Sequence, residues 1–173
     1  MASMLGRAAI GQIGLVVRDL ERAMEMYWET AGIGPWNVYT TGAPPLSCIY
    51  RDQAANYKIR LATTSSGHLQ MELIQYLSGD TIHRDFLALG REGVEHVGIF
   101  VPNLEEALQP YQDRGIGILQ RADGLGVKGD GRYAYLDTES TLGIILELIQ
   151  SSSQPQPPER IYPERSFTQR KER

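Results

Sequence analysis

The chain contains the stretch GQIGLVVRDLERA at residues 11–23 and repeats it, 84 positions later, as EHVGIFVPNLEEA at residues 95–107. The identical positions of the first copy are Gly14, Val17, Leu20, Glu21 and Ala23, which recur as Gly98, Val101, Leu104, Glu105 and Ala107. A second repeat, Glu-Leu-Ile-Gln, occurs at residues 72–75 and 147–150, in the same order along the chain. Internal repetition on this scale indicates two copies of one supersecondary unit.

Each copy begins with a strand pattern that passes into a helix pattern. From Gln12 onward, apolar side chains alternate along the first strand, as they do in a strand with one buried face. Asp19 and Asn103 stand at the N-cap positions of the helix patterns that follow. Short segments rich in branched and aromatic residues come after each helix pattern. The order of strand, helix and three strands, twice, predicts an α+β fold built from two tandem βαβββ modules.

The repeats also predict how the chain is divided. We expect the first module over residues 8–77, a linker with a short amphipathic helix over residues 78–91, and the second module over residues 92–150. Residues 151–173 are rich in Pro and Ser and read as a linker followed by a mobile tail. The modules can pair within one chain or by exchange across a dimer, and we expect a homodimer.

Composition and charge exclude several classes of protein. Lys plus Arg number 17 against 21 Asp plus Glu, a net charge of −4, which lacks the basic excess of a nucleic-acid-binding protein. Cys48 is the single cysteine, so an intrachain disulfide and a cysteine-based zinc site are excluded. No apolar stretch approaches the roughly 20 residues of a membrane helix, and the first ten residues do not resemble a signal peptide. We therefore expect a cytoplasmic protein with a small-molecule substrate and neither nucleic acid nor membrane as partner.

Four polar residues occupy matching positions in strands that are otherwise apolar. Gln12 and His96 stand at the start of the first strand of each module, and Glu72 and Glu147 stand in the last strand. A carboxylate among branched apolar side chains is costly unless it is solvated, paired or bound to a cation. If the modules pair about a pseudo-twofold axis, the four residues converge. Two facing carboxylates would repel each other, and a divalent ion would remove that repulsion.

This set of donors favours one divalent metal ion. An amide oxygen, an imidazole and two carboxylates suit zinc, cobalt, manganese, nickel or magnesium. Taken singly, each residue has a plainer interpretation, a solvated strand face for a glutamate and a structural role for a histidine. The repeated placement is what favours a metal site. His68 and His83 have no partner in the repeat, and we expect both at the surface.

The repeated unit resembles the vicinal oxygen chelate superfamily, which includes glyoxalase I, methylmalonyl-CoA epimerase, extradiol dioxygenases and bleomycin-resistance proteins. The resemblance rests on the two repeated segments and covers residues 10–150. It implies that paired βαβββ modules close an incomplete β-barrel around a metal, with ligands on the first and last strand of each module. Those positions are Gln12, Glu72, His96 and Glu147.

The resemblance leaves the branch of the superfamily open. The ligand set is similar to that of eukaryotic-type glyoxalase I, but Val16 and Tyr76 replace that family's arginine and asparagine. Residues 82–100 look more like methylmalonyl-CoA epimerase, although its first two ligands are usually His and Gln, and residues 48–52 lack its glutamate base. Extradiol dioxygenases are disfavoured, because their iron site uses two histidines and Gln12 removes one of them.

The resemblance implies removal of a proton alpha to a carbonyl, with the metal as a Lewis acid that stabilises the enolate. We assign Glu147 as the base, Glu72 as the carboxylate that returns the proton, and Gln12 and His96 as plain ligands. The leading hypothesis is a metal-dependent isomerase or lyase most like a methylmalonyl-CoA (acyl-CoA) epimerase. The alternatives are a lactoylglutathione lyase, or glyoxalase I, acting on a thiol adduct, and a non-catalytic small-molecule-binding protein of the resistance type.

Overall fold

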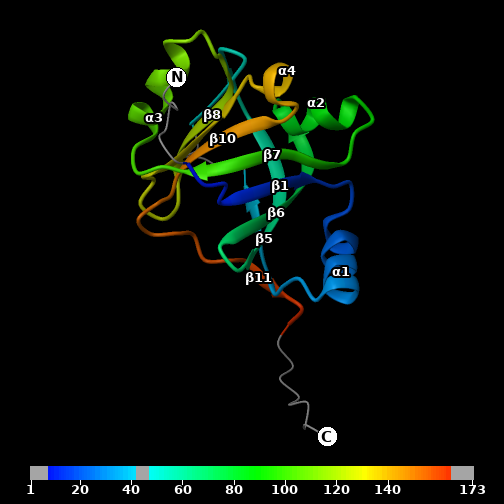
Figure 1. Ribbon diagram of the computed structural model, residues 1–173. Coiled ribbons are helices and arrows are strands. Elements are labelled where there is room, and N and C mark those ends of the chain that lie inside the picture. Colours follow the sequence, from blue (N-terminus) through cyan, green and yellow to red (C-terminus); the bar gives the residue numbers. More distant parts are fainter. Residues whose placement is uncertain (1–7, 42–46, 165–173) are drawn as a thin grey trace, which may run out of the picture.

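The computed structural model describes residues 8–41 and 47–164 (Figure 1). The first repeat folds as β1 (Gln12–Val16), α1 (Leu20–Ala31), β2 (Trp36–Thr41), β5 (Tyr57–Ser66) and β6 (Leu69–Gly79). A hairpin of two short strands, β3 (Ser47–Tyr50) and β4 (Gln53–Ala55), lies between β2 and β5 in sequence. Helix α1 begins after Asp19, whose side chain accepts a hydrogen bond from the backbone N–H of Arg22.

The second repeat has the same order of elements. It comprises β7 (Gly93–Phe100), α3 (Leu104–Gln112), β8 (Ile118–Leu125), β9 (Gly131–Leu136), the short helix α4 (Glu139–Leu142) and β10 (Ile145–Gln150). Helix α2 (Ile82–Ala88) joins the repeats, and β11 (Arg160–Tyr162) follows the second one. The Asn103 side chain caps α3 by accepting from the backbone N–H groups of Glu105 and Glu106. The predicted α+β fold of two βαβββ units is confirmed.

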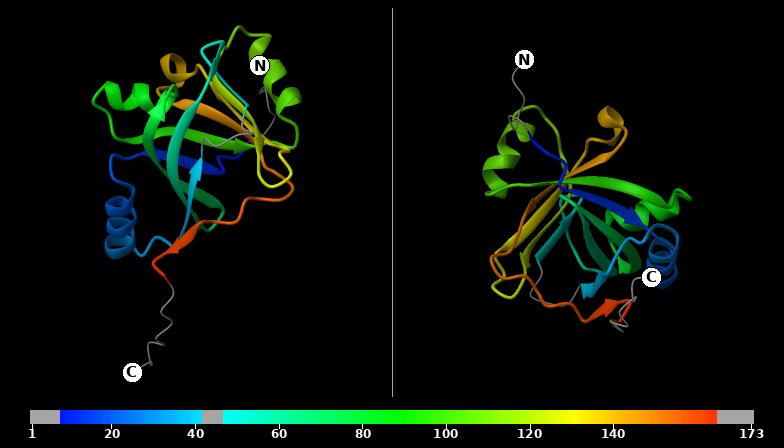
Figure 2. Two further views of the ribbon diagram at one scale, coloured as in Figure 1. Left: turned by 180° about the vertical axis from the view of Figure 1, so that it is seen from behind. Right: turned by 60° about the horizontal axis from the view of Figure 1, so that its bottom comes forward.

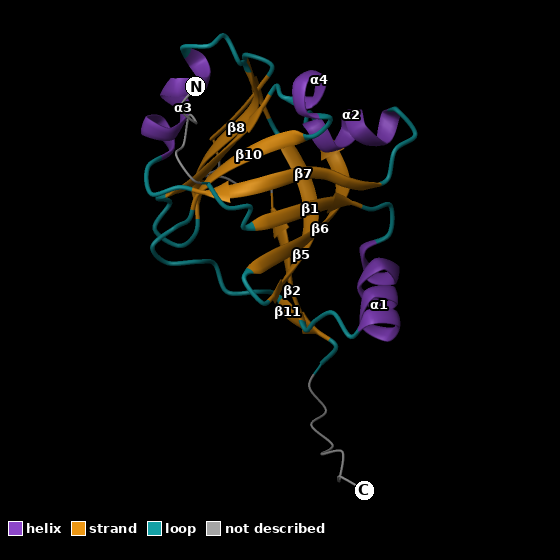
Figure 3. Cartoon of the chain, viewed as in Figure 1, coloured by secondary structure: helices purple, strands orange, loops and turns teal. Residues whose placement is uncertain are grey.

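The strands of the described residues form one sheet in the order β11-β2-β5-β6-β1-β7-β10-β9-β8-β3-β4. At its centre β1 runs antiparallel to β7, and each of these strands has the last strand of its own module as a parallel neighbour. The modules are therefore joined within the chain about a pseudo-twofold axis. The sheet curls into an incomplete barrel with the helices outside it (Figures 2 and 3). No helix in residues 8–41 or 47–164 is long and apolar enough to cross a membrane.

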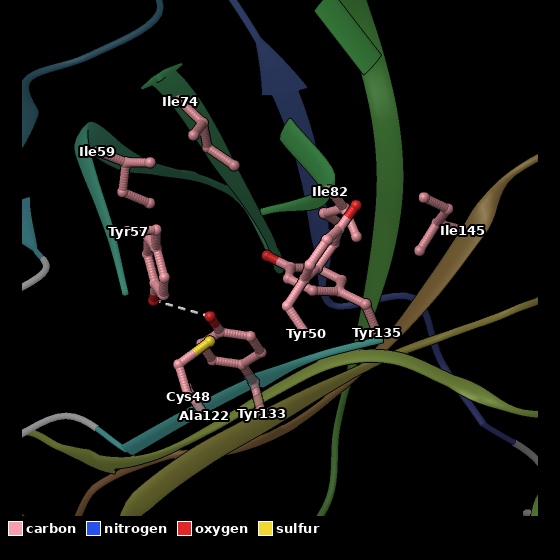
Figure 4. Close-up of a cluster of buried hydrophobic side chains, with 10 residues drawn as sticks. All are labelled: Cys48, Tyr50, Tyr57, Ile59, Ile74, Ile82, Ala122, Tyr133, Tyr135 and Ile145. Atoms are coloured by element: carbon pink, nitrogen blue, oxygen red, sulfur yellow. Dashed lines mark hydrogen bonds between the residues drawn. The ribbon is translucent and has the colours of Figure 1, made fainter. Parts of the chain in front are cut away.

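Each module has a hydrophobic core beneath its helix. The side chains buried between α1 and the sheet are Leu15, Val17, Leu20, Met24, Trp36, Val38, Ala62 and Leu73. Those buried between α3 and the sheet are Leu104, Ala107, Leu108, Tyr111, Ala134, Leu136, Leu146 and Leu148. A third cluster lies inside the curled sheet and draws on both modules, with Tyr57, Ile59 and Ile74 from the first and Tyr133, Tyr135 and Ile145 from the second (Figure 4). Because burial of a large apolar side chain contributes roughly 1.5–3 kcal/mol, these clusters stabilise each module and their junction.

Two segments pair with the module to which they do not belong in sequence. Strand β3 pairs with β8 of the second module, and β11 returns to pair with β2 of the first. Within the segment expected to be a linker and mobile tail, residues 160–162 form a strand, while residues 165–173 lie outside the described part of the chain. Tertiary contacts hold β11 in place, because Glu159 accepts hydrogen bonds from the backbone N–H and hydroxyl of Thr40. Arg160 adds an ion pair with Glu21.

The pairing of β11 is testable through two neighbouring side chains. Tyr162 packs against the cluster under α1, whereas Ile161 is 38% exposed. Tyr162→Ala should lower the free energy of unfolding by about 1–2 kcal/mol, because it removes apolar contacts from a partly buried site. Ile161→Ala should change it by less than about 0.5 kcal/mol. Urea denaturation measures both values, and faster amide exchange in β2 should accompany the first variant. Equal effects of the two variants would contradict this packing.

Candidate metal centre

The four predicted site residues lie on the two central strands and their parallel neighbours: Gln12 on β1, Glu72 on β6, His96 on β7 and Glu147 on β10. Two glycines of the repeat connect them through strand pairing. Gly14 pairs with His96 across β1 and β7 and with Glu72 across β1 and β6. Gly98 pairs with the other two residues in the same way. The pseudo-twofold axis thus brings two of the predicted site residues from each module to the centre of the sheet.

The glycines leave the space that the side chains of His96 and Gln12 occupy. A Cβ atom on Gly14 would lie 1.9 Å from Cε1 and 2.0 Å from Nε2 of His96. A Cβ atom on Gly98 would lie 2.8 Å from Oε1 of Gln12. Because neither glycine has a side chain, the imidazole and the amide can each fold over the backbone of the neighbouring central strand.

His96 is in contact with both predicted carboxylates. Its Nε2 atom lies 3.3 Å from Oε2 of Glu147 and 3.8 Å from Oε2 of Glu72. The imidazole is fully buried, and Glu147 and Gln12 are 4% and 5% exposed. Gln12, Glu72 and Glu147 line one cavity of about 200 Å³. The structure therefore brings all four sequence-predicted residues to one place.

Three of the four predicted ligands keep a buried polar atom that makes no hydrogen bond within the described residues. These atoms are Oε1 of Gln12, Nε2 of His96 and Oε2 of Glu147. The Gln12 amide nitrogen donates to Oε1 of Gln70 at 2.8 Å, and this bond identifies the amide oxygen as the unpaired atom. Buried polar atoms without a partner are costly. A cation would satisfy the two oxygens and the deprotonated imidazole nitrogen together.

The charges of this cluster shift the pKa values of its members. Burial, together with repulsion from Glu147, raises the pKa of Glu72 to about 7. Burial by itself would lower the pKa of His96, but the carboxylates of Glu147 and Glu95 raise it to about 10. With the ion absent, a protonated imidazole thus compensates the surrounding negative charge.

The residues fit a divalent ion by donor chemistry. Within residues 8–41 and 47–164, no group of three or more His, Cys, Asp or Glu side chains has the arrangement of a metal centre. The imidazole of His96 forms an ion pair with Glu147. The atoms that make no hydrogen bond nevertheless belong to an amide, an imidazole and a carboxylate, which together with the second carboxylate form a set that divalent metals accept.

The cavity beside these residues has an apolar side and a side lined by hydroxyl groups. Ile59, Leu61 and Ile74 form the apolar lining. The hydroxyls of Tyr57 and Tyr133 are hydrogen-bonded to each other at 2.8 Å (Figure 4). Burial raises the pKa of both tyrosines, so they remain neutral hydroxyl groups. The cavity is therefore suited to a small organic group held close to the two glutamates.

Comparison with known families identifies the fold. Residues 11–135 match the model of the glyoxalase/bleomycin resistance protein/dioxygenase superfamily, which is more than half of the chain. The chain belongs to this superfamily. The resemblance to the vicinal oxygen chelate superfamily inferred from the two repeats is thereby confirmed.

The individual proteins that resemble this chain have low sequence identity to it. An uncharacterized protein of Bacillus subtilis, YqjC, is 23% identical over 141 residues, which is 82% of this chain and 91% of that protein. A hypothetical protein of Bacillus halodurans superposes with a TM-score of 0.61 at 19% identity, over 86% of this chain and 97% of the other. A Streptomyces coelicolor methylmalonyl-CoA epimerase variant bound to 2-nitronate-propionyl-CoA superposes with a TM-score of 0.58 at 21% identity, over 87% and 99%. At such identities the structures show a shared fold alone.

The sequence analysis did not predict that two further polar residues, His83 and Glu95, are buried beside this site. His68 is exposed as expected, but the expectation of a surface position for His83 is wrong, since its side chain on α2 is 1% exposed. Its Nδ1 atom lies 2.6 Å from Oε2 of Glu95, the residue before His96. A signal was available for His83, which stands one helical turn before the apolar Phe86 and Leu87. Glu95 carries no such signal in its strand.

The role of the repeat glycines in this superfamily member can be tested with alanine. Gly14→Ala should lower the free energy of unfolding by about 1–3 kcal/mol, because its methyl group would overlap the His96 imidazole. Gly117→Ala is the matched control, since a Cβ atom there would meet only Asp137 Cβ, at 3.9 Å. Urea denaturation gives the stabilities, and NMR shifts of the His96 imidazole should change in the first variant only. A stable Gly14→Ala protein with unchanged His96 shifts would contradict the proposed close approach.

Proposed function

We propose that this protein is a metal-dependent isomerase or lyase that removes a proton alpha to a carbonyl, most like an acyl-CoA epimerase. The observation that carries the proposal is the pair of glutamates, one from each module, that approach the buried imidazole of His96 beside a cavity. A pocket that only retains a small molecule has no need for two largely buried carboxylates at one point, since burying them is costly.

The four residues would share the work of holding the ion and moving the proton. Gln12, His96, Glu72 and Glu147 would hold one divalent ion, of zinc, cobalt, manganese, nickel or magnesium, through oxygen and nitrogen atoms. When bound, the ion would act as a Lewis acid on the substrate's carbonyl oxygen. Nε2 of His96 faces both glutamates and lies fully buried, so it would serve as a ligand that water does not reach.

Glu147 is the proposed base, and Glu72 is the carboxylate that returns the proton. The two belong to different modules and are related by the pseudo-twofold axis, so they can act on a carbon between them from two sides. Epimerisation requires two groups on opposite faces, because Glu147 would take the alpha proton from one face of the carbon and a protonated Glu72 would give its own proton to the other. The apolar wall of Ile59, Leu61 and Ile74 would hold the small acyl group and exclude water.

The structural neighbours support a thioester as the substrate class. Two of the matching structures are methylmalonyl-CoA epimerases in complex with 2-nitronate-propionyl-CoA or with methylmalonyl-CoA, at 21% identity to this chain. A thiol adduct processed by a glyoxalase-type lyase involves the same proton abstraction and is the second candidate. A homodimer stays a prediction.

Metal content is the first measurement for this proposal. Protein purified without a polyhistidine tag should contain about one divalent ion per chain by mass spectrometry, as expected for one site built from four donors. The double variant Glu72→Gln plus Glu147→Gln should lose it, because two anionic ligands become neutral amides. The matched control is Glu25→Gln plus Glu29→Gln, which makes the same change of charge at two exposed positions of α1. Wild-type protein that stays free of metal after supplementation would refute the metal site.

Alpha-proton exchange tests the assignment of the base. Glu147→Gln should slow exchange of the alpha proton of acyl-CoA thioesters in deuterated water by at least about 100-fold, since it removes general-base catalysis. NMR or mass spectrometry of the thioester measures the exchange, and circular dichroism confirms that the variant is folded. Near-normal exchange in Glu147→Gln would remove this residue from the mechanism. Binding of thioesters and thiol adducts without any exchange in the wild type would favour a non-catalytic binding protein.

A further inference from the structure

A carboxylate lies completely buried between two imidazoles behind the candidate metal centre. Oε2 of Glu95, on β7, lies 2.6 Å from Nδ1 of His83 and 3.2 Å from Nδ1 of His96. The exposed fractions of the three side chains are 0%, 1% and 0% for Glu95, His83 and His96. The group connects helix α2, which lies between the repeats, to the central strand of the second module.

An irregularity in the sheet directs the Glu95 side chain into this position. In the pairing of β1 with β7, Gly14 is opposite His96 and Leu15 is opposite Val94, so Glu95 has no opposite residue. Such a bulge places an extra residue in one strand and re-aims its side chain. Regular alternation would send Glu95 to the other face of the sheet from His96. With the bulge, both neighbouring side chains are buried and in contact.

Packing alone does not account for this group. A buried carboxylate paired with imidazoles contributes little net stability compared with apolar residues of similar size, because both charges must be removed from water. Glu95 is instead placed to contact both imidazoles, since its Oε2 atom lies within 3.2 Å of Nδ1 of each. A charged acceptor behind an imidazole is the arrangement that orients metal-bound histidines in proteins.

We propose that Glu95 is a positioning residue that turns the His96 imidazole toward the ion, and that His83 in turn holds Glu95. The inference rests on the proposed metal site. By accepting a hydrogen bond from Nδ1 of His96, the carboxylate leaves Nε2 as the ligand atom, on the side of Glu72 and Glu147. His83 would fix the carboxylate through the shorter contact, so that the ligand is already oriented before the ion binds.

Metal affinity of the isolated protein tests this role without an activity assay. Glu95→Gln should weaken Zn²⁺ binding about 10–100-fold, measured by competition with a chromophoric chelator. It should also shift the absorption bands of bound Co²⁺, because the imidazole is no longer fixed. His83→Gln should have a smaller effect in the same direction. Glu92→Gln is the matched control, since this carboxylate, three residues before Glu95, is exposed and pairs only with Arg18 among the described residues.

A second readout does not depend on the metal. In the metal-free protein, the Nδ1–H proton of His96 should give a downfield NMR signal that Glu95→Gln removes and Glu92→Gln retains. If Glu95→Gln does not fold by circular dichroism, Glu95→Asp, which withdraws the carboxylate by one methylene group, should show the same loss of affinity and of the signal.

The outcomes separate the two proposals. Wild-type affinity and an unchanged His96 signal in a folded Glu95 variant would overturn the positioning role and leave the metal site standing. Absence of Zn²⁺ and Co²⁺ binding in the wild type would overturn the metal site, and with it the positioning of a ligand.

Discussion

The antiparallel pairing of β1 with β7 is the contact on which the candidate site depends. It places Gly14 opposite His96 and Gly98 opposite Gln12. Because glycine has no side chain, the imidazole and the amide can each lie over the backbone of the neighbouring central strand. The parallel neighbours β6 and β10 then bring one glutamate each to the same point. A site assembled in this way exists only when the two modules are paired, because neither module carries more than half of it.

The assembled site concentrates negative charge around one buried imidazole. Glu72, Glu147 and Glu95 all have an oxygen within 3.8 Å of His96. Groups of this kind are costly to bury and are found mainly at functional sites, where the charge is matched by a ligand or used in a reaction. The surrounding cores offset that cost, since each module packs its own apolar cluster under a helix, and a third cluster joins the modules beside the cavity.

Each module also pairs with a strand that belongs in sequence to the other module or follows it. The hairpin that contains β3 leaves the first module to extend the second, and β11 follows the second module to extend the first. The two outer edges of the curled sheet are therefore each completed by a segment of the other module. The cavity lies between these modules and is lined by residues of both, such as Tyr57 and Tyr133.

The sequence by itself determined the two repeated units, their order of elements and the four polar residues of the candidate site. These features are visible locally, because repetition, strand alternation and helix caps such as Asp19 depend on neighbouring residues. Only the tertiary structure decided the bulge that turns Glu95 inward and the pairing of β11 with β2. The physical reason is that each of these depends on a partner distant in sequence or on register between strands, and composition and local pattern carry no information about either.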